Sequence, residues 1–276
     1  MKIAISSESS VDLDKVLLEK YDIQVLPFEI LLGDKIEVDG QISPEDIFCH
    51  AQSFKTLPKT SALNTEEYKT FFQKLLKTYD RVIHLSLSSG ISSTFYNAQK
   101  AAEELENVVV IDSQSLSTGI GIKAIRLREM LESGVPEEQA IENVKNMKMQ
   151  VSALISKLDF MYKGGRCSSL AYFGANLLKL KPRIIVENGK VKNSHIYRGK
   201  MEKAIKDYVI DTLKEFPANK DFVSITFTTI EEELLNKTKE ICEQQGFKNI
   251  IFTKAGATVS CHCGENCVGI MYECLK

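Results

Sequence analysis

The sequence predicts an α/β protein whose second half is α+β. In the first half, short apolar runs alternate with amphipathic helical patterns, as is typical of right-handed crossovers in a parallel sheet with helices on both faces. In the second half, Asn188-Gly189 separates two short strands. This dipeptide tolerates positive φ and favours a two-residue hairpin turn, so antiparallel strands are expected there. We place the boundary between the two domains, 1–150 and 151–276, where the pattern changes.

The elements of the first half follow one another at βα spacing. We expect strands at 2–6, 81–87 and 108–111, and helices at 12–21, 92–105 and 119–133. A serine-rich turn follows the first strand. Asn64 and Glu67 have the spacing of a capping box, which predicts a further helix that starts near Thr65.

The second half mixes hairpin strands with helices. We expect helices at 137–147, 158–162, 168–180 and 230–245, and strands at 151–156, 183–187, 190–197, 222–228, 250–253 and 268–272. The hairpin makes part of this sheet antiparallel, which distinguishes it from the first one.

Composition narrows the class of protein. The chain has 276 residues, of which 43% are hydrophobic, and this is enough for a substantial core. The formal net charge is -2, and residues of both signs are mixed along the chain, so the sequence lacks the basic clusters typical of nucleic-acid-binding proteins. No apolar run approaches the roughly 20 residues that a membrane span needs, and the start is too quickly polar for a secretory signal. We expect a cytoplasmic protein.

Seven cysteines, an odd number, favour reduced thiols over a disulfide framework. Cys261, His262, Cys263 and Cys267 are of the residue types that bind zinc, so a metal or redox-sensing site is one alternative. Their spacing matches none of the common paired zinc motifs. We favour the interpretation that they are small core residues.

Three places carry groups that could bind an anion. The segment from Ser86 to Thr94 runs from a strand into a helix, whose free N–H groups would favour a carboxylate or phosphate, although the hydroxyls could equally serve as helix caps. Thr60 and Ser61 lie upstream of the capping box and have no structural role assigned to them. His262 is expected in a polar loop between two late strands, where its imidazole could donate to a carboxylate.

Common catalytic motifs are missing. There is no Walker loop, and no Gly-x-Gly-x-x-Gly follows the first strand. The segment from Gly90 to Thr94 resembles the start of a nucleophile elbow but lacks its closing glycine. Kinase, dehydrogenase and hydrolase interpretations are therefore disfavoured.

Several colinear blocks resemble the signature of the DegV fatty-acid-binding family over nearly the whole chain. The blocks are Ser7-Glu8-Ser9-Ser10-Val11-Asp12-Leu13, Pro27 to Gly40, Lys59-Thr60-Ser61, Ile91-Ser92-Ser93-Thr94-Phe95, Ile111-Asp112-Ser113, Gly164-Gly165-Arg166-Cys167-Ser168, Lys181-Pro182, Arg198 to Ala204 and Ser260 to Gly269. Each block is short, and their shared order makes the resemblance specific.

The resemblance implies two domains that hold one long-chain fatty acid, such as palmitate, in a tunnel between them. It implies that Thr60, Ser61, Ser92 and His262 bind the carboxylate, and that Ser93, Arg166 and Arg198 support the site or face a partner. That partner would be a separate ATP-dependent fatty acid kinase, which makes an acyl phosphate, so the chain itself would not be an enzyme. No cofactor or metal is implied, and transient membrane contact is compatible with this role.

Three positions depart from the family pattern. Glu8 replaces an aspartate, Ser93 stands where glycine is expected, and Glu265-Asn266 replace Pro-Gly after the histidine. Two other classes stay open. One is an acyl hydrolase or transferase with Ser92 as nucleophile and His262 as base, and the other is the Cys/His metal or redox-sensing protein.

Overall fold

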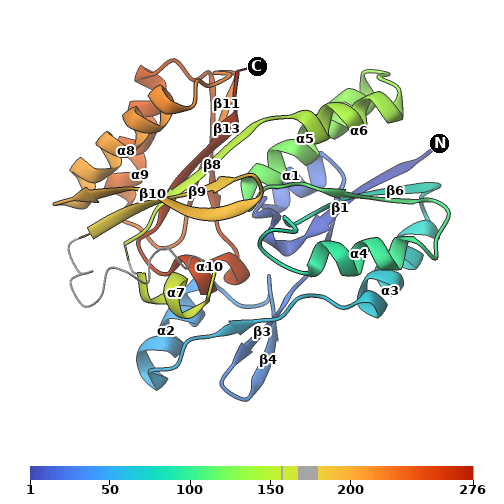
Figure 1. Cartoon of the computed structure of the whole chain (residues 1–276), viewed down its shortest axis with the longest axis horizontal. Coiled ribbons are helices and arrows are strands. Elements are labelled where there is room, and N and C mark those ends of the chain that lie inside the picture. Colours follow the sequence, from blue (N-terminus) through green and yellow to red (C-terminus); the bar gives the residue numbers. More distant parts are fainter. Residues whose placement is uncertain (157, 167–179, 276) are drawn as a thin grey trace.

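The computed structural model describes residues 1–156, 158–166 and 180–275. Three sheets organise these residues (Figure 1). Their strand orders are β2-β1-β6-β7, β10-β9-β8-β13-β11-β12 and β4-β3-β5. The predicted fold class is confirmed.

The first sheet is entirely parallel. Its strands are β1 (Ile3–Glu8), β2 (Ile23–Leu26), β6 (Arg81–Ser86) and β7 (Val108–Asp112). The central strands β1 and β6 read as nearly continuous buried runs, because helices cover both of their faces.

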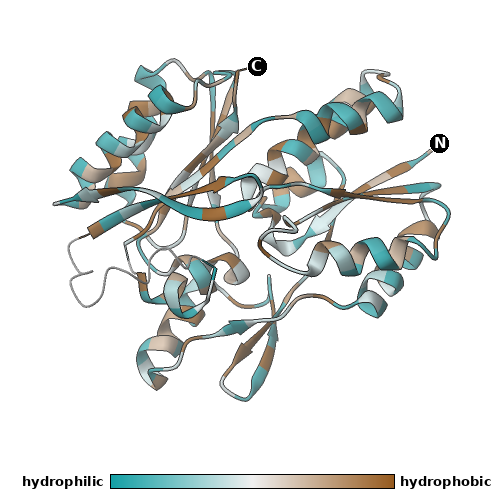
Figure 2. Ribbon diagram, in the orientation of Figure 1, coloured by the Kyte–Doolittle hydropathy of each residue, from teal (hydrophilic) through white to brown (hydrophobic). Residues whose placement is uncertain are grey.

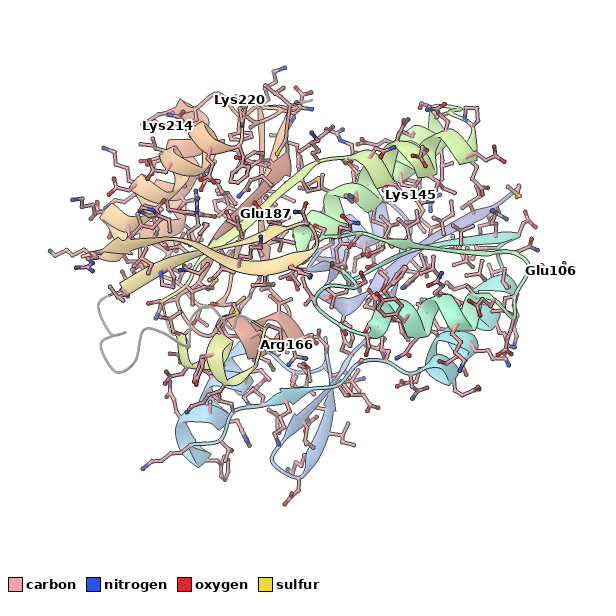
Figure 3. The ribbon with its side chains drawn as sticks, in the orientation of Figure 1. Glu106, Lys145, Arg166, Glu187, Lys214 and Lys220 are labelled. Carbon is pink, nitrogen blue, oxygen red and sulfur yellow. The ribbon has the colours of Figure 1, made fainter. Side chains whose placement is uncertain are left out.

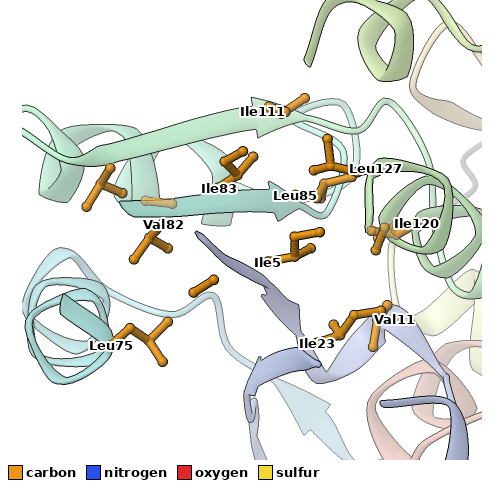
Figure 4. Close-up of a cluster of buried hydrophobic side chains, with 14 of the residues drawn as sticks. Ile5, Val11, Ile23, Leu75, Val82, Ile83, Leu85, Ile111, Ile120 and Leu127 are labelled. Carbon is orange, nitrogen blue, oxygen red and sulfur yellow. The ribbon is translucent and has the colours of Figure 1, made fainter. Parts of the chain in front are cut away.

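Five helices of the first half accompany this sheet. They are α1 (Lys15–Lys20), α3 (Thr65–Leu76), α4 (Thr94–Ala102), α5 (Thr118–Glu132) and α6 (Glu137–Asn146). Figure 1 shows α3 and α4 on one side of the sheet and α5 on the other. The core between them includes Ile5, Ile83, Leu85 and Leu127, all fully buried (Figure 4).

The second sheet is antiparallel except for the parallel pair β11 and β12. Its strands are β8 (Met149–Leu154), β9 (Leu180–Glu187), β10 (Lys190–Arg198), β11 (Phe222–Phe227), β12 (Asn249–Lys254) and β13 (Val268–Glu273). Helices α8 (Met201–Glu215) and α9 (Glu232–Gln244) pack on it, and their outer surfaces carry many hydrophilic residues (Figure 2). The predicted hairpin is confirmed, since Asn188 and Gly189 have φ of 50° and 72°.

Helix α5 joins the two large sheets. Ile120 and Leu127 belong to the core of the parallel sheet, while Ile122 packs with Val151 and Met271 of the second sheet. The helix is therefore buried on more than one face, unlike an ordinary amphipathic surface helix.

The third sheet is small and lies below the other two in Figure 1. It consists of β3 (Glu29–Leu32), β4 (Lys35–Val38) and the short β5 (Lys59–Thr60). Around it pack α2 (Pro44–Phe54), α7 (Leu158–Lys163) and α10 (Ala257–Cys263), and the 3-10 helix η1 (Ser9–Val11) packs on α10. Ile30, Phe48, Phe160 and Cys261 form their shared core.

Several predictions need correction. The helix expected at 12–21 begins only at Lys15, where Asp14 caps it, because Asp12 is left-handed with φ of 50°. Helices α2 and α8 and strands β2 to β5 were not anticipated. The helix expected at 168–180 falls on residues 167–179, outside those that the structure describes, and Leu180 already begins β9.

The polar loop expected around His262 is wrong, because residues 257–263 form α10. This segment has small and β-branched residues of modest helix propensity. Its helix is stabilised by packing between two apolar clusters, one reached by Cys261 and the other by Cys263.

Within the described parts of the chain, no helix is long and apolar enough to cross a membrane.

Candidate functional site: a cavity between the two halves

A cavity lies where the three sheets meet. It encloses about 1030 Å³, including space open to solvent, and both halves of the chain line it. Most of its wall is apolar, formed by Phe28, Leu87, Leu116, Ile155, Ile184, Val259 and Met271 among others. Such a cavity suits the apolar part of a ligand.

Thr60 and His262 form the polar pair of this cavity. Their side chains, 202 residues apart in sequence, are joined by a hydrogen bond of 2.9 Å between Thr60 Oγ1 and His262 Nε2. Thr60 is placed by the pairing of β5 with Ile30 of β3, and His262 is placed by α10. Backbone pairing and helix packing therefore bring a hydroxyl and an imidazole together.

His262 is neutral at pH 7. Burial and, to a smaller extent, the nearby positive charge of Arg166 lower the pKa of its imidazole to about 4. Its Nδ1 is buried and has no hydrogen-bond partner in the described structure. Gly164 makes the room for it, because a Cβ at residue 164 would lie 2.7 Å from that Nδ1. One ring nitrogen is thus held by Thr60, and the other is unpaired.

Ser92 lines the cavity just before α4. Its Oγ accepts from Thr94 N at 3.2 Å and donates to Thr94 Oγ1 at 2.8 Å. Ser92 therefore bonds to the first residue of α4 and also lines the cavity, while the N-cap position itself is Ser93, whose side chain makes no cap hydrogen bond.

The neighbouring serines have structural roles. Ser88 Oγ donates to the carbonyl of Gly189 at 2.7 Å, which ties this loop to the hairpin of the second half. Ser89 Oγ donates to Asp112. The serine-rich segment therefore supplies one cavity-lining hydroxyl and two anchors.

Glu8 holds the start of the serine-rich segment through hydrogen bonds to Ser86 and Leu87. Sequence reasoning missed this role. The Glu8 carboxylate accepts from Leu87 N at 2.9 Å and Ser86 Oγ at 2.8 Å, and His84 Nε2 lies 3.0 Å away. Burial raises the pKa of Glu8, but the charge and hydrogen bond of His84, with that of Tyr68, outweigh it and hold the pKa below its usual value. The only sequence signal was an acidic residue at the end of a buried strand.

Two buried aspartates hold the beginning of α10. Gly256 N donates to Asp12 Oδ1 at 2.7 Å, and Ala257 N donates to Asp39 Oδ1 at 2.9 Å. Burial raises the pKa of Asp12 to about 8, with a smaller contribution from the charge of Asp39. The helix that carries His262 is therefore fixed by aspartates from the first half, at the end where its N–H groups are free.

The structure brings most of the predicted site residues together. Thr60, Ser61, Ser92, Arg166 and His262 all line the cavity. Ser93 is exposed and lies with Arg166 at an outer depression. Arg198 is exposed at the end of β10 and does not line the cavity.

An open groove adjoins the polar pair on its outer side. Thr60, Arg166 and His262 line both this groove and the cavity. Figure 3 shows Arg166 beside α7 and α10. The groove also carries Lys55, Lys59, Lys163 and Lys181, against the acidic residues Asp159 and Glu265. Its charge suits an anionic group.

The late cysteines do not converge on a metal site. Cys261 and Cys263 belong to different apolar clusters, and Cys267 packs with Cys263. Among the described residues, no group of three or more histidine, cysteine or acidic side chains could hold a metal ion. Burial raises the pKa of the Cys261 thiol, as expected for unreactive core cysteines.

The fold and the cavity together define an α/β protein with a largely apolar cavity between its sheets. A family model described as "Uncharacterised protein, DegV family" matches residues 2–274. The chain therefore belongs to the DegV family.

Individual relatives match over full length. A protein of Thermotoga maritima named "Fatty acid-binding protein" is 30% identical, covering 100% of this chain and 99% of that protein. The structure of a DegV family protein from Thermus thermophilus, described for its fatty acid binding, superposes with a TM-score of 0.89 at 25% identity and full coverage of both chains. A DegV lipid-binding protein from Thermotoga maritima has a TM-score of 0.84 at 27% identity, with coverage of 100% and 99%.

Proposed function

We propose that this chain binds one long-chain fatty acid in the cavity between its halves, with the carboxylate at Thr60, Ser61, Ser92 and His262. The observation that carries the proposal is the apolar cavity that ends at the Thr60–His262 pair. The names of the full-length relatives support the same ligand class.

The energetics suit an acyl chain. Sixteen or so carbons gain roughly 0.8 kcal/mol per buried CH₂, on the order of 12 kcal/mol before ordering costs. A carboxylate at the end of such a cavity needs donors, because an unpaired buried charge is costly. His262 Nδ1 is a suitable donor in the tautomer in which Nε2 accepts from Thr60 Oγ1, and Ser61 adds a neutral hydroxyl to the cavity wall. Such neutral donors leave a carboxylate oxygen free to react.

The finer role that we propose is presentation of the carboxylate to a separate ATP-dependent kinase. The basic groove supports this role, since it adjoins the polar pair and would accept a phosphoryl group or a developing acyl phosphate. Chemistry would then belong to the partner. We also propose that the boundary between the two domains lies near residue 150 and that the protein is cytoplasmic.

The binding proposal is tested by native mass spectrometry of gently purified protein, followed by titration of delipidated protein with palmitate. We expect one fatty acid per chain. Val259→Phe, which fills the apolar wall, should weaken binding at least tenfold, whereas the exposed Ser133→Ala should bind as the parent does. Titration that detects no palmitate binding would refute the proposal.

The partner role is tested by charge reversal in the groove and on β10. We expect Arg166→Glu and Arg198→Glu to lower acyl-phosphate formation with the cognate kinase and ATP more than they lower palmitate affinity. Arg198→Glu should keep palmitate, whereas Arg166→Glu places a negative charge on the cavity wall and should weaken palmitate binding as well. Lys145→Glu, on α6 away from the cavity, is the control of equal charge change. Normal turnover in both arginine variants would rule out a docking role for them.

The hydrolase alternative gains no support from the geometry. A serine nucleophile needs its base within hydrogen-bond reach. His262 Nε2 instead bonds to Thr60, and the hydrogen bonds of Ser92 Oγ go to Thr94. A serine-directed acylating probe should therefore leave Ser92 unlabelled.

A further inference from the structure

Two hydroxyls of the cavity wall have no hydrogen-bond partner in the described structure. They are Ser10 Oγ and Thr258 Oγ1, and their residues are only 1% and 6% exposed. Other buried hydroxyls of the wall are bonded within the protein, as when Thr228 Oγ1 donates to the carbonyl of Gly264 at 2.8 Å. A buried hydroxyl without a partner is unusual and calls for an explanation.

Local structure explains why neither hydroxyl is paired internally. Thr258 is the second residue of α10 after the N-cap Gly256, so no helical carbonyl lies one turn before it. Thr238, in the body of α9, shows the usual alternative, since its hydroxyl donates to Leu234 O at 2.7 Å. Thr258 therefore needs a partner from outside its own helix.

Ser10 belongs to η1, which packs against α10. It lies in η1 between Ser9, whose hydroxyl donates to Asp39, and Asp12, which accepts from Gly256 N. Because Asp39 also accepts from Ala257 N, these bonds fix η1 against the beginning of α10. The two unpaired hydroxyls are thus carried by two segments that are held together, and both line one apolar cavity.

The distance from the polar pair follows from helix geometry. Thr258 lies four residues before His262 on α10, so the two share a helix face about 6 Å apart along the axis. An extended carbon chain advances about 1.25 Å per carbon, given bonds near 1.5 Å and angles near 111°. A chain that leaves the polar pair along α10 would therefore pass Thr258 about five carbons beyond the carboxyl.

We propose that Ser10 and Thr258 form a polar subsite for a fatty acid that carries an oxygen substituent, a hydroxyl or a keto group, in the carboxyl-proximal half of its chain. The inference rests on the proposed function and narrows its substrate class. A substituent hydroxyl accepts from one residue and donates to the other, whereas an unsubstituted CH₂ leaves both unpaired. A site built to bond an oxygen disfavours the analogue that lacks it.

The test compares delipidated parent protein with the variant Ser10→Ala/Thr258→Val. Hexadecanoates with one hydroxyl near the fifth carbon, one hydroxyl on the terminal carbon, or none are titrated against each. The parent should bind the carboxyl-proximal isomer about tenfold more tightly than palmitate, and the variant should lose that preference while it retains palmitate. Thr238→Val, a buried threonine outside the cavity, is the control.

The outcomes separate the inference from the proposed function. If palmitate binds but the parent shows no preference for the hydroxylated chain, the inference fails alone. If the double variant binds palmitate more tightly than the parent does, and its preference for the hydroxylated chain over palmitate is unchanged, water satisfies the two hydroxyls in the parent. This result would also overturn the inference. If no hexadecanoate binds the parent, both fail. If the double variant does not fold, the single variants are compared. Ser10→Ala must lower the preference for the hydroxylated chain, and Thr258→Ser, which retains a hydroxyl, must keep it.

Discussion

At the scale of single residues, the site depends on donors placed at the end of an apolar cavity. Thr60 and His262 are bonded to each other, and Ser92 lines the same cavity. None of these side chains carries a fixed charge near neutral pH, since burial holds the pKa of His262 at about 4. A carboxylate there would be stabilised by hydrogen bonds from these side chains and by the positive charge of Arg166, which also lines the cavity.

Removing two donors should weaken fatty-acid binding without unfolding the protein. We expect Thr60→Ala/Ser92→Ala to lose roughly 1.5–3 kcal/mol of binding free energy for each charge-assisted bond. Calorimetric titration with palmitate measures the loss, and circular dichroism checks the fold. Ser89→Ala, which removes only a bond to Asp112, is the matched serine control. Parental affinity in the double variant would argue against the carboxylate site.

His262 should make stability depend on acidity. Its folded pKa of about 4 lies below the usual value of about 6.5, so between these values the unfolded chain binds a proton that the folded chain does not. The free energy of unfolding should therefore fall as the pH drops from about 7.5 to about 5, by about 1–2 kcal/mol from this group. In urea titrations, His262→Gln should lack this decrease in the free energy of unfolding, whereas His195→Gln, at an exposed position, should still show it.

At the scale of elements, contacts between distant segments position the site. The hairpin turn of β9 and β10 packs on the loop that carries Ser92, and the aspartates of the first half cap α10. Each half of the molecule therefore fixes a binding element of the other.

The hairpin contact leaves no space for a side chain. Gly189→Ala should destabilise the protein by about 2–3 kcal/mol, because φ is 72° and the new Cβ would lie 2.6 Å from Ser88 Oγ. Gly134→Ala, where φ is 85° in open space, should cost only about 1 kcal/mol of backbone strain. Chemical denaturation compares the two, and equal losses would mean that the contact is unimportant.

Titration of Asp12 should change the free energy of unfolding with pH in the opposite direction to titration of His262. Its folded pKa of about 8 lies above its usual value of 3.8, so this group's favourable contribution is lost as the pH rises from about 4 through 8. Asp12→Asn should therefore gain about 1–3 kcal/mol relative to the parent between about pH 5 and about pH 8.5. Unfolding curves at both pH values give the difference. A constant difference between the proteins would show that the carboxyl does not titrate in this range.

At the scale of the whole molecule, the two halves share a helix and a cavity. Ile122 of α5 packs with Val151 and Met271 of the second sheet, while other residues of α5 belong to the first core. We therefore expect one unfolding transition, to which the bound ligand contributes.

Palmitate at about 100 times its dissociation constant should stabilise the protein by about 2.7 kcal/mol, or raise its melting temperature by about 5 °C. Hexadecanol, which lacks the carboxylate, should give a smaller shift. Scanning calorimetry measures both shifts and shows whether the transition stays single. Equal shifts for acid and alcohol would mean that the polar end adds nothing to affinity.

The sequence by itself determined the strands and helices with strong local signals. The capping box at Asn64 and Glu67 and the hairpin at Asn188-Gly189 are present as predicted, because short-range hydrogen bonds and backbone preferences set them. Family resemblance in the order of the blocks pointed to the residues that line the cavity.

Only the tertiary structure decided that His262 lies on a helix, that Thr60 bonds to it, and that Glu8 and Asp12 support the site. These facts depend on contacts between segments 60 to 244 residues apart, for which local propensity carries no information. Helix α10 has weak intrinsic preference and exists because apolar clusters on both sides and two aspartates at its start stabilise it. Packing and long-range pairing therefore settled the geometry that the residue types alone left open.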